Sequence, residues 1–261
     1  MLTPIQLAFR LVSTLPIAYP KQSENYLQKL EDKDNKSLSI ASCLPLVGIV
    51  LGGIIALVMS AFAASRLYFD PIFISIIGVL LMLALTRMMH IDAIADVFDA
   101  GFGGFSVEDR YKILKDPHIG VFGVIAVVIS LMLYAYFFNV LYEHSALRLI
   151  ILVMCLSRFS ASLSAYFVKP FEKNGLGKSI SRPPQGIDYL FVALSMFLAF
   201  LLSLQVLPTH MLFIYLVFSL VIVSFVPQFL SRPFLGTNGD VMGATIVISE
   251  LLLYTLAICF L

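Results

Sequence analysis

Charge is scarce in this sequence: charged residues occupy 13% of its 261 positions, whereas hydrophobic residues occupy 60%. An ordinary soluble domain carries about 25% charged residues, so the composition argues against a water-exposed globular domain and predicts a chain whose main solvent is lipid. The net charge of +1 supplies no basic field, which argues against nucleic acid as a partner.

Cysteine is also sparse. Cys43, Cys155 and Cys259 are odd in number and lie far apart inside apolar runs, as buried small hydrophobic residues do, so a disulfide framework or a zinc cluster is not indicated. The sequence has no His-Glu-x-x-His pattern, and a zinc protease therefore has little support.

The first twenty residues do not resemble a cleavable signal, because polar residues interrupt the apolar stretch 5–17 and no small-residue cleavage site follows. We expect this stretch to be retained. Apolar residues recur there at helical spacing, which fits either an amphipathic helix at the membrane surface or a first helix packed on the bundle. Residues 21–36 are predicted to be a solvated connector, so that 1–38 forms one N-terminal segment of a single-domain chain.

Long apolar stretches predict an all-α, polytopic membrane helix bundle. A bilayer core of about 30 Å needs roughly 20 mainly apolar residues per helix. Seven stretches qualify: 39–63, 71–89, 120–141, 147–168, 189–207, 210–229 and 241–261.

The loop charges predict the orientation. Of the 14 Lys and Arg residues outside these stretches, 13 fall on the side of the N-terminus. By the positive-inside rule that side is cytoplasmic. We therefore expect a multi-pass protein of the cell (inner) membrane whose N-terminus and polar chemistry face the cytoplasm.

An acidic stretch follows the second span. If a helix continues there, Asp92, Asp96 and Asp99 lie at i, i+4 and i+7 and share one face. Like charges at this spacing repel, and Mg²⁺, or alternatively Mn²⁺, bridged to a phosphate would neutralise them. The other interpretation is an acidic helix end solvated in the cytoplasm. His90 lies roughly opposite Asp92 and joins the same site only if the helix begins or bends there.

Polar residues in the following cytoplasmic loops are candidates to hold an anionic substrate. Lys115 and His118 are placed to meet phosphate oxygens, and Asp116 adds a carboxylate. A second loop, which begins at Lys169, is rich in basic residues. Positive-inside topology alone also accounts for the basic residues of that loop.

Two charges lie inside predicted spans, where ionisable residues are functional candidates by default. Arg158 is near the middle of the fourth span, and Glu250 lies in the last one and needs either Arg158 or a cation as its partner. Gly239-Asp240 precedes the last span, where Asp240 either caps the helix or joins the acidic site.

Together these segments resemble the cobalamin synthase family, the adenosylcobinamide-GDP ribazoletransferases. The aspartate block with the Lys-Asp and glycine residues after it carries most of this resemblance. The similar blocks are Ser13-Thr14-Leu15-Pro16, Leu44-Pro45-Leu46-Val47-Gly48 with Gly52, His90-Ile91-Asp92 through Asp99, Ile113-Leu114-Lys115-Asp116 with Gly120 and Gly123, Ser157-Arg158, Gly175-Leu176-Gly177, and Gly239-Asp240 with Gly243-Ala244 and Glu250.

The resemblance implies that α-ribazole, or its 5′-phosphate, attacks adenosylcobinamide-GDP and that GMP leaves. Such a displacement needs divalent ions on the diphosphate and a group that accepts the proton. We expect the following roles: His90, Asp92, Asp96 and Asp99 catalytic; Asp92, Asp96, Asp99, Asp240 and Glu250 as metal ligands; Lys115, Asp116, Arg158, Lys169, Gly239 and Asp240 as substrate ligands. His90 or a spare carboxylate is the expected proton acceptor.

The chain departs from the family pattern at a few positions. Ala93 and Ala100 stand where the family usually has glycine, and Pro117-His118 replaces Ser-Arg, but no carboxylate is lost. Two other functions stay open: a cation transporter or channel, and a phosphotransferase that moves another diphosphate-linked headgroup. Polar residues gather in loops rather than at mid-depth, which argues against transport. The sequence leaves homo-oligomerisation open.

Overall fold

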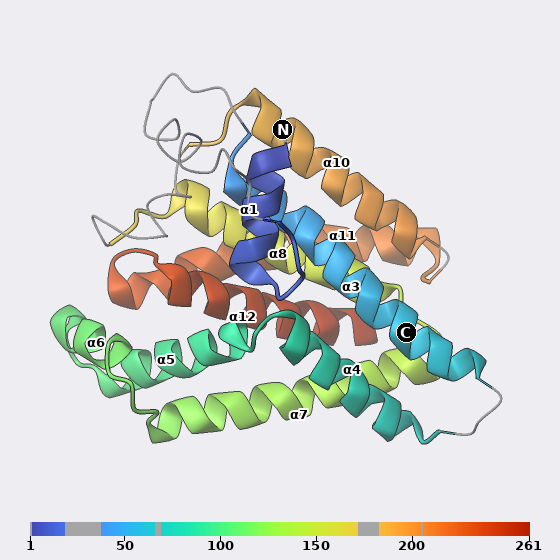
Figure 1. Cartoon of the computed structure of the whole chain (residues 1–261), viewed down its shortest axis with the longest axis horizontal. Helices are drawn as coiled ribbons and strands as arrows, with labels where there is room; N and C mark the ends of the chain where they lie inside the picture. The colour runs from blue at the N-terminus through green and yellow to red at the C-terminus, as the bar shows by residue number, and fades with distance from the viewer. Residues whose placement is uncertain (1, 19–37, 66–68, 172–182, 205) are drawn as a thin grey trace.

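Helices make up nearly all of the described structure. The computed structural model describes residues 2–18, 38–65, 69–171, 183–204 and 206–261, and in these ranges no β-strand forms beyond one isolated bridge between Pro170 and Thr237. The predicted all-α fold is thus confirmed. The elements, labelled as in Figure 1, are α1 (Leu2–Val12), α3 (Ile40–Ala64), α4 (Pro71–Leu85), α5 (Met89–Gly103), α6 (Val107–Leu114), α7 (Val121–Glu143), α8 (Leu149–Phe167), α10 (Gly186–Ser203), α11 (Thr209–Ser231), η1 (Arg232–Phe234) and α12 (Gly239–Ile258).

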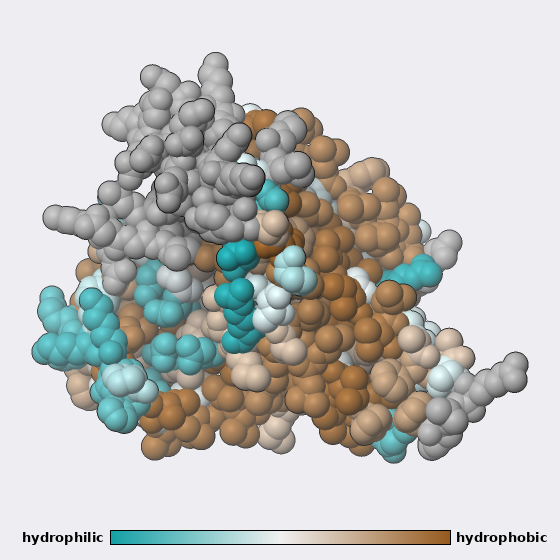
Figure 2. Space-filling view, in the orientation of Figure 1, coloured by the Kyte–Doolittle hydropathy of each residue, from teal (hydrophilic) through white to brown (hydrophobic). Residues whose placement is uncertain are grey.

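Six helices are long and apolar enough to cross a membrane: α3, α7, α8, α10, α11 and α12. They match six of the seven predicted spans to within a few residues. Large apolar side chains of α7, α10 and α11 point outward, among them Met132, Phe197 and Phe213. Figure 2 shows a broad hydrophobic surface over the bundle, while hydrophilic residues gather at the end where α6 lies. Such a surface suits a lipid environment.

Helix α8 forms the centre of the bundle. It packs against α3, α10, α11 and α12, and most of its side chains are buried. The contact with α3 is closest at Gly48, where an added Cβ would lie 2.1 Å from the backbone oxygen of Met154. Only glycine lets the two backbones approach so closely, and α3 and α8 therefore form one frame.

The second predicted span, 71–89, is not one straight helix. Helix α4 ends at Leu85, α5 begins at Met89, and the two meet at 85°. Arg87 and Met88 between them have φ angles of 54° and 59°, in the left-handed region that stops a helix. The segment after this break, which lies outside the predicted spans, forms α5 and α6. The break directs α5 away from the axis of α4.

Thr14 completes the end of α4. Its backbone N–H donates to the oxygen of Leu85 at 2.8 Å, and its hydroxyl donates to the oxygen of Ala84 at 3.0 Å. The last carbonyl groups of a helix lack partners within the helix, and Thr14 satisfies two of them. Helix α1, just before Thr14, buries Ala8 and Phe9 and packs on α3. The predicted packing of this segment on the bundle is therefore observed.

Polar contacts join helix ends at one side of the bundle. The buried carboxylate of Asp188, at the start of α10, accepts from the backbone N–H of Ser39 at 2.8 Å, just before α3. The backbone N–H of Thr237 donates to the oxygen of Lys169 at 2.9 Å, which joins the end of α8 to the segment before α12. The ends that meet here belong to the predicted N-terminal side of the bundle.

Candidate active site

Two of the three predicted aspartates are open on one face of α5. Residues 89–103 are helical as the spacing required, with Asp92 exposed and Asp96 half-buried. Partial burial, followed by the negative charges of Asp92, Asp240 and Asp99, raises the pKa of Asp96 to about 6. Negative charges held this close favour a bound cation.

Asp99 has a different role from its two neighbours. It is 8% exposed, and its carboxylate accepts the backbone N–H groups of Gly120 at 2.7 Å and Gly123 at 2.8 Å. These are unpaired donors at the start of α7, where a negative charge is stabilising. The structure thus places Asp99 as the cap of α7, with both oxygens engaged, rather than beside Asp92 as a metal ligand.

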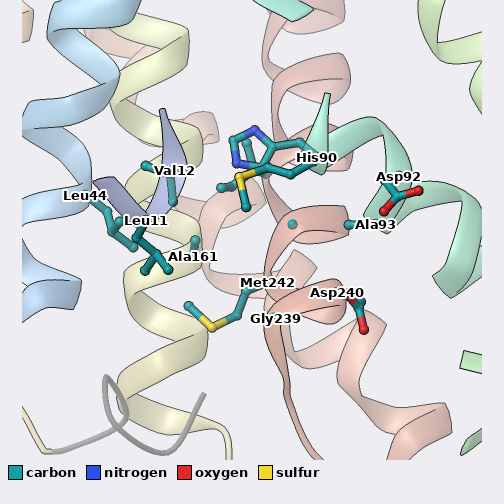
Figure 3. A pocket seen from close by; sticks show the side chains of 13 residues that line it. Leu11, Val12, Leu44, His90, Asp92, Ala93, Ala161, Gly239, Asp240 and Met242 are labelled. Atoms are coloured by element: carbon teal, nitrogen blue, oxygen red, sulfur yellow. The ribbon is translucent and has the colours of Figure 1, made fainter. Parts of the chain in front are cut away.

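Helix α12 brings Asp240 to the carboxylate face of α5. The two helices touch at Gly243, where an added Cβ would lie 2.6 Å from the Cβ of Ala93. Asp92 and Asp240 line one cavity from these two helices, and Figure 3 shows both carboxylates on the same side of it. Asp240 also accepts from the Nδ2 of Asn238 at 2.8 Å. The predicted grouping of Asp240 with the α5 aspartates is therefore present.

Asp92 and Asp96 line a polar cavity of about 350 Å³. Its opposite wall is the segment from Leu114 to Ile119, which includes Lys115 and His118. The ring and backbone N–H of His118 bond to Asp116 and hold the pKa of that carboxyl below its usual range. A basic rim faces the acidic helix across a space of this size, as a bound phosphate ester and cation would require.

A second, apolar cavity of about 300 Å³ lies on the other side of Asp92, between α1, α3, α5, α8 and α12. His90 lines it and is 7% exposed, and within the described residues its Nε2 has no hydrogen-bond partner. Leaving a buried polar atom unpaired costs about 1–3 kcal/mol. In Figure 3 the ring of His90 extends from α5 toward Val12, away from the carboxylate of Asp92. The break before α5 therefore places His90 beside the carboxylates without joining them.

Comparison with known proteins decides the family. The family model described as cobalamin-5-phosphate synthase matches residues 4–258. The chain belongs to that family. Proteins named adenosylcobinamide-GDP ribazoletransferase are similar to this chain over most of its length. One from Thermoanaerobacter sp. (strain X514) is 29% identical over 89% of this chain and 90% of its own length. One from Acinetobacter baumannii is 28% identical over 99% and 98%. No solved structure matches.

Arg158 and Glu250 form a buried ion pair inside the helix bundle. Arg158 is fully buried and Glu250 is 2% exposed. The Nη1 of Arg158 donates to Oε1 of Glu250, which also accepts from the hydroxyl of Ser157 at 3.1 Å, and Tyr134 donates to Oε2. Of the two predicted partners of Glu250, Arg158 is therefore the one observed. Neither residue lines the polar cavity, so the structure does not bring Arg158 to a phosphate or Glu250 to the aspartates.

Lys169 is exposed at the end of α8, and its backbone oxygen accepts a hydrogen bond from the backbone N–H of Thr237. It lines neither cavity, whereas Gly239 lines the apolar one. The basic residues Lys173, Lys178 and Arg182, like the connector 21–36, lie outside the described residues.

Sequence reasoning missed the apolar cavity. Its walls include Leu11 and Val12 from α1, Leu44 from α3 and Met242 from α12. These are apolar residues among many, and only the helix packing brings them together, so no local pattern distinguishes them. The unpaired Nε2 of His90 is a polar signal at this cavity, and it becomes visible only when burial is known.

Proposed function

We propose that this chain is an adenosylcobinamide-GDP ribazoletransferase. In the reaction a ribose hydroxyl of α-ribazole, or of its 5′-phosphate, forms a P–O bond to the phosphorus that carries adenosylcobinamide. The P–O bond to GMP breaks, GMP leaves, and the hydroxyl proton passes to a base. Membership of the synthase family and the names of the similar proteins support this substrate pair.

The observation that carries the proposal is that Asp92 lines both cavities. One cavity is polar and faces Lys115 and His118, and the other is apolar and contains His90. A displacement at phosphorus needs a charged donor and a hydroxyl acceptor to meet in line. Two chemically different cavities that meet at one carboxylate provide that arrangement, with the diphosphate on the polar side and the acceptor on the apolar side.

We assign Mg²⁺, with Mn²⁺ as an alternative, to the carboxylates between the cavities. The oxygen donors of Asp92, Asp96 and Asp240 suit these hard cations. Among the described residues no three His, Cys, Asp or Glu side chains converge closely enough to form a metal site by themselves. Mg²⁺ is usually held by one or two carboxylates, with water and substrate phosphates as its other ligands, so this donor set fits it. When bound, the ion neutralises charge on the diphosphate.

The protein's own residues supply position and proton transfer. Lys115 and His118 lie where they bind phosphate oxygens of the leaving GMP. A carboxylate of Asp92 or Asp240 that holds no cation accepts the hydroxyl proton, because both face the junction whereas the ring of His90 turns away from it. Of the two predicted proton acceptors, His90 and a carboxylate, we therefore favour the carboxylate.

The two alternative functions receive less support. A cation pathway would need free intramembrane charges, but Arg158 and Glu250 neutralise each other. Another headgroup phosphotransferase would share the aspartates but not the match over residues 4–258. We place the protein in the cell (inner) membrane with its cavities facing the cytoplasm, because the basic segments lie on that side by the positive-inside rule.

One incubation tests the proposal. Detergent-purified protein is mixed with adenosylcobinamide-GDP, α-ribazole and Mg²⁺, and GMP and the corrinoid product are separated by chromatography. We expect GMP and product in equal amounts, a large loss with Asp96→Asn, and no loss with Glu143→Gln, an exposed acid that lines neither cavity. Absence of GMP from the wild-type protein, with ion flux in liposomes, would identify a transporter instead.

A further inference from the structure

The apolar cavity has mainly apolar walls, and His90, one of the residues that line it, carries a buried nitrogen without a hydrogen-bond partner among the described residues. We propose that this cavity binds the bicyclic aromatic base of the nucleoside acceptor, and that Nε2–H of His90 donates a hydrogen bond to the unsubstituted ring nitrogen of that base. This assignment rests on the proposed function, because it divides the two substrates between the two cavities.

His90 supplies the polar contact. The side chain is more than nine-tenths buried and lines the cavity, and its Nε2 has no partner among the described residues. Buried polar atoms in folded proteins are nearly always paired, so an unpaired one that lines a cavity indicates a ligand atom. The base of α-ribazole offers one such acceptor, since its other ring nitrogen carries the ribose.

The remaining walls suit an aromatic ring. Leu11, Leu44, Met242 and Ile246 present apolar groups from three helices, and methionine sulfur contacts aromatic rings favourably. A volume of about 300 Å³ is at the lower limit of small-molecule cavities. It admits a nucleoside base and excludes a corrinoid, which must therefore lie outside this cavity.

Asp92 fixes the direction of the bound nucleoside. Because this residue also lines the polar cavity, a base seated against His90 directs its ribose toward the carboxylates, where the phosphorus is attacked. A lipid chain would satisfy the apolar walls, but it has no acceptor for Nε2 and leaves that atom unpaired. The polar atom thus favours the nucleoside over lipid.

Direct binding of α-ribazole tests the hydrogen bond. Affinity is measured on the full chain in detergent, without adenosylcobinamide-GDP, for α-ribazole and for the matching dimethylindole riboside, in which carbon replaces the ring nitrogen. We expect His90→Phe to bind α-ribazole about fivefold to tenfold more weakly, as loss of one neutral hydrogen bond implies. His90→Gln, which keeps a donor, should lose less.

The analogue makes this test specific. The wild type should prefer α-ribazole over the indole riboside by the same factor, and His90→Phe should not distinguish the two. If His90→Phe still prefers α-ribazole by the wild-type factor, the assignment of His90 is wrong.

A filled cavity provides a second test with a matched control. Ala161 and Ala165 lie one turn apart on α8 and are both buried, but only Ala161 lines the cavity. Ala161→Leu should lower α-ribazole affinity at least about tenfold, whereas Ala165→Leu, the same substitution at a buried position outside the cavity, should not. Equal affinity of the two variants for α-ribazole would overturn the proposal. So would a cavity for which lipid competes and α-ribazole does not.

The outcomes separate the two proposals. If wild-type protein releases GMP but α-ribazole affinity does not respond to Ala161→Leu or His90→Phe, the transferase function stands and the cavity assignment fails. If wild-type protein binds α-ribazole as described but releases no GMP, the cavity assignment stands and the transferase function fails.

Discussion

The contact between Gly243 and Ala93 sets the spacing of the carboxylates, and Gly243→Ala tests this directly. The added Cβ would lie 2.6 Å from the Cβ of Ala93, whereas ordinary contact begins at 3.4 Å, so α5 and α12 must separate by about 0.8 Å. That shift moves Asp240 away from Asp92. Misplacement of about 1 Å costs roughly 100-fold in rate, and we expect GMP release to fall by about that factor.

Two further variants are assayed beside Gly243→Ala, a control and a compensating double variant. Gly101→Ala, also on a helix at the site, places its Cβ in open space and should keep wild-type activity. The double variant Ala93→Gly with Gly243→Ala removes the opposing methyl group and should recover activity to within about tenfold, less the roughly 1 kcal/mol that a helical glycine costs. Rates are compared at equal amounts of folded protein, judged by size-exclusion profile and detergent melting.

Two results would refute this reasoning. Full activity in Gly243→Ala would show that the spacing of the two helices is not critical. A double variant that is folded but as inactive as the single one would show that the methyl contact is not the cause.

Three further predictions concern the buried pair, the cap and the metal. Arg158→Met should lower stability by about 3–5 kcal/mol because Glu250 is left charged and unpaired, and replacing both residues should recover most of the melting temperature; equal melting of single and double variants would contradict this. Gly123→Ala, whose Cβ would lie 2.3 Å from Oδ2 of Asp99, should cost about 1–3 kcal/mol without changing the Mg²⁺ requirement, which a metal titration checks. A chelator should abolish GMP release, Mg²⁺ or Mn²⁺ should restore it, and Asp96→Asn should raise the required Mg²⁺ at least about tenfold; an unchanged titration would remove Asp96 from the metal site.

Hydropathy and spacing predicted much of this molecule. The spans, the helical face of Asp92 and Asp96, and the family were all accessible because they depend on local composition and order. The bend at Arg87 and Met88 was not, because its left-handed residues are not glycines and carry no turn signature. Its partner Thr14 is distant in sequence, and a tertiary contact of this kind leaves no periodic pattern.

The roles of the remaining acids show a second limit of sequence reasoning. Asp99 has the same spacing on α5 as a metal ligand would have. Both of its carboxylate oxygens, however, accept hydrogen bonds from backbone N–H groups at the start of α7. Glu250 had two candidate partners, and only the packing of α8 on α12 selects Arg158. Residue type and periodicity define what a side chain can bind, and the neighbouring helix decides what it does bind.

The apolar cavity joins parts of the chain that are made at very different times during synthesis. Leu11 lies near the beginning of the sequence and Ile246 near its end, and both line the same space. The wall from α1 is fixed by Thr14 only after residues 84 and 85 exist, and the carboxylate of Asp240 arrives later still. An incomplete chain therefore lacks this cavity, and on the proposed function a nascent or truncated copy in the membrane neither binds the nucleoside nor consumes the corrinoid.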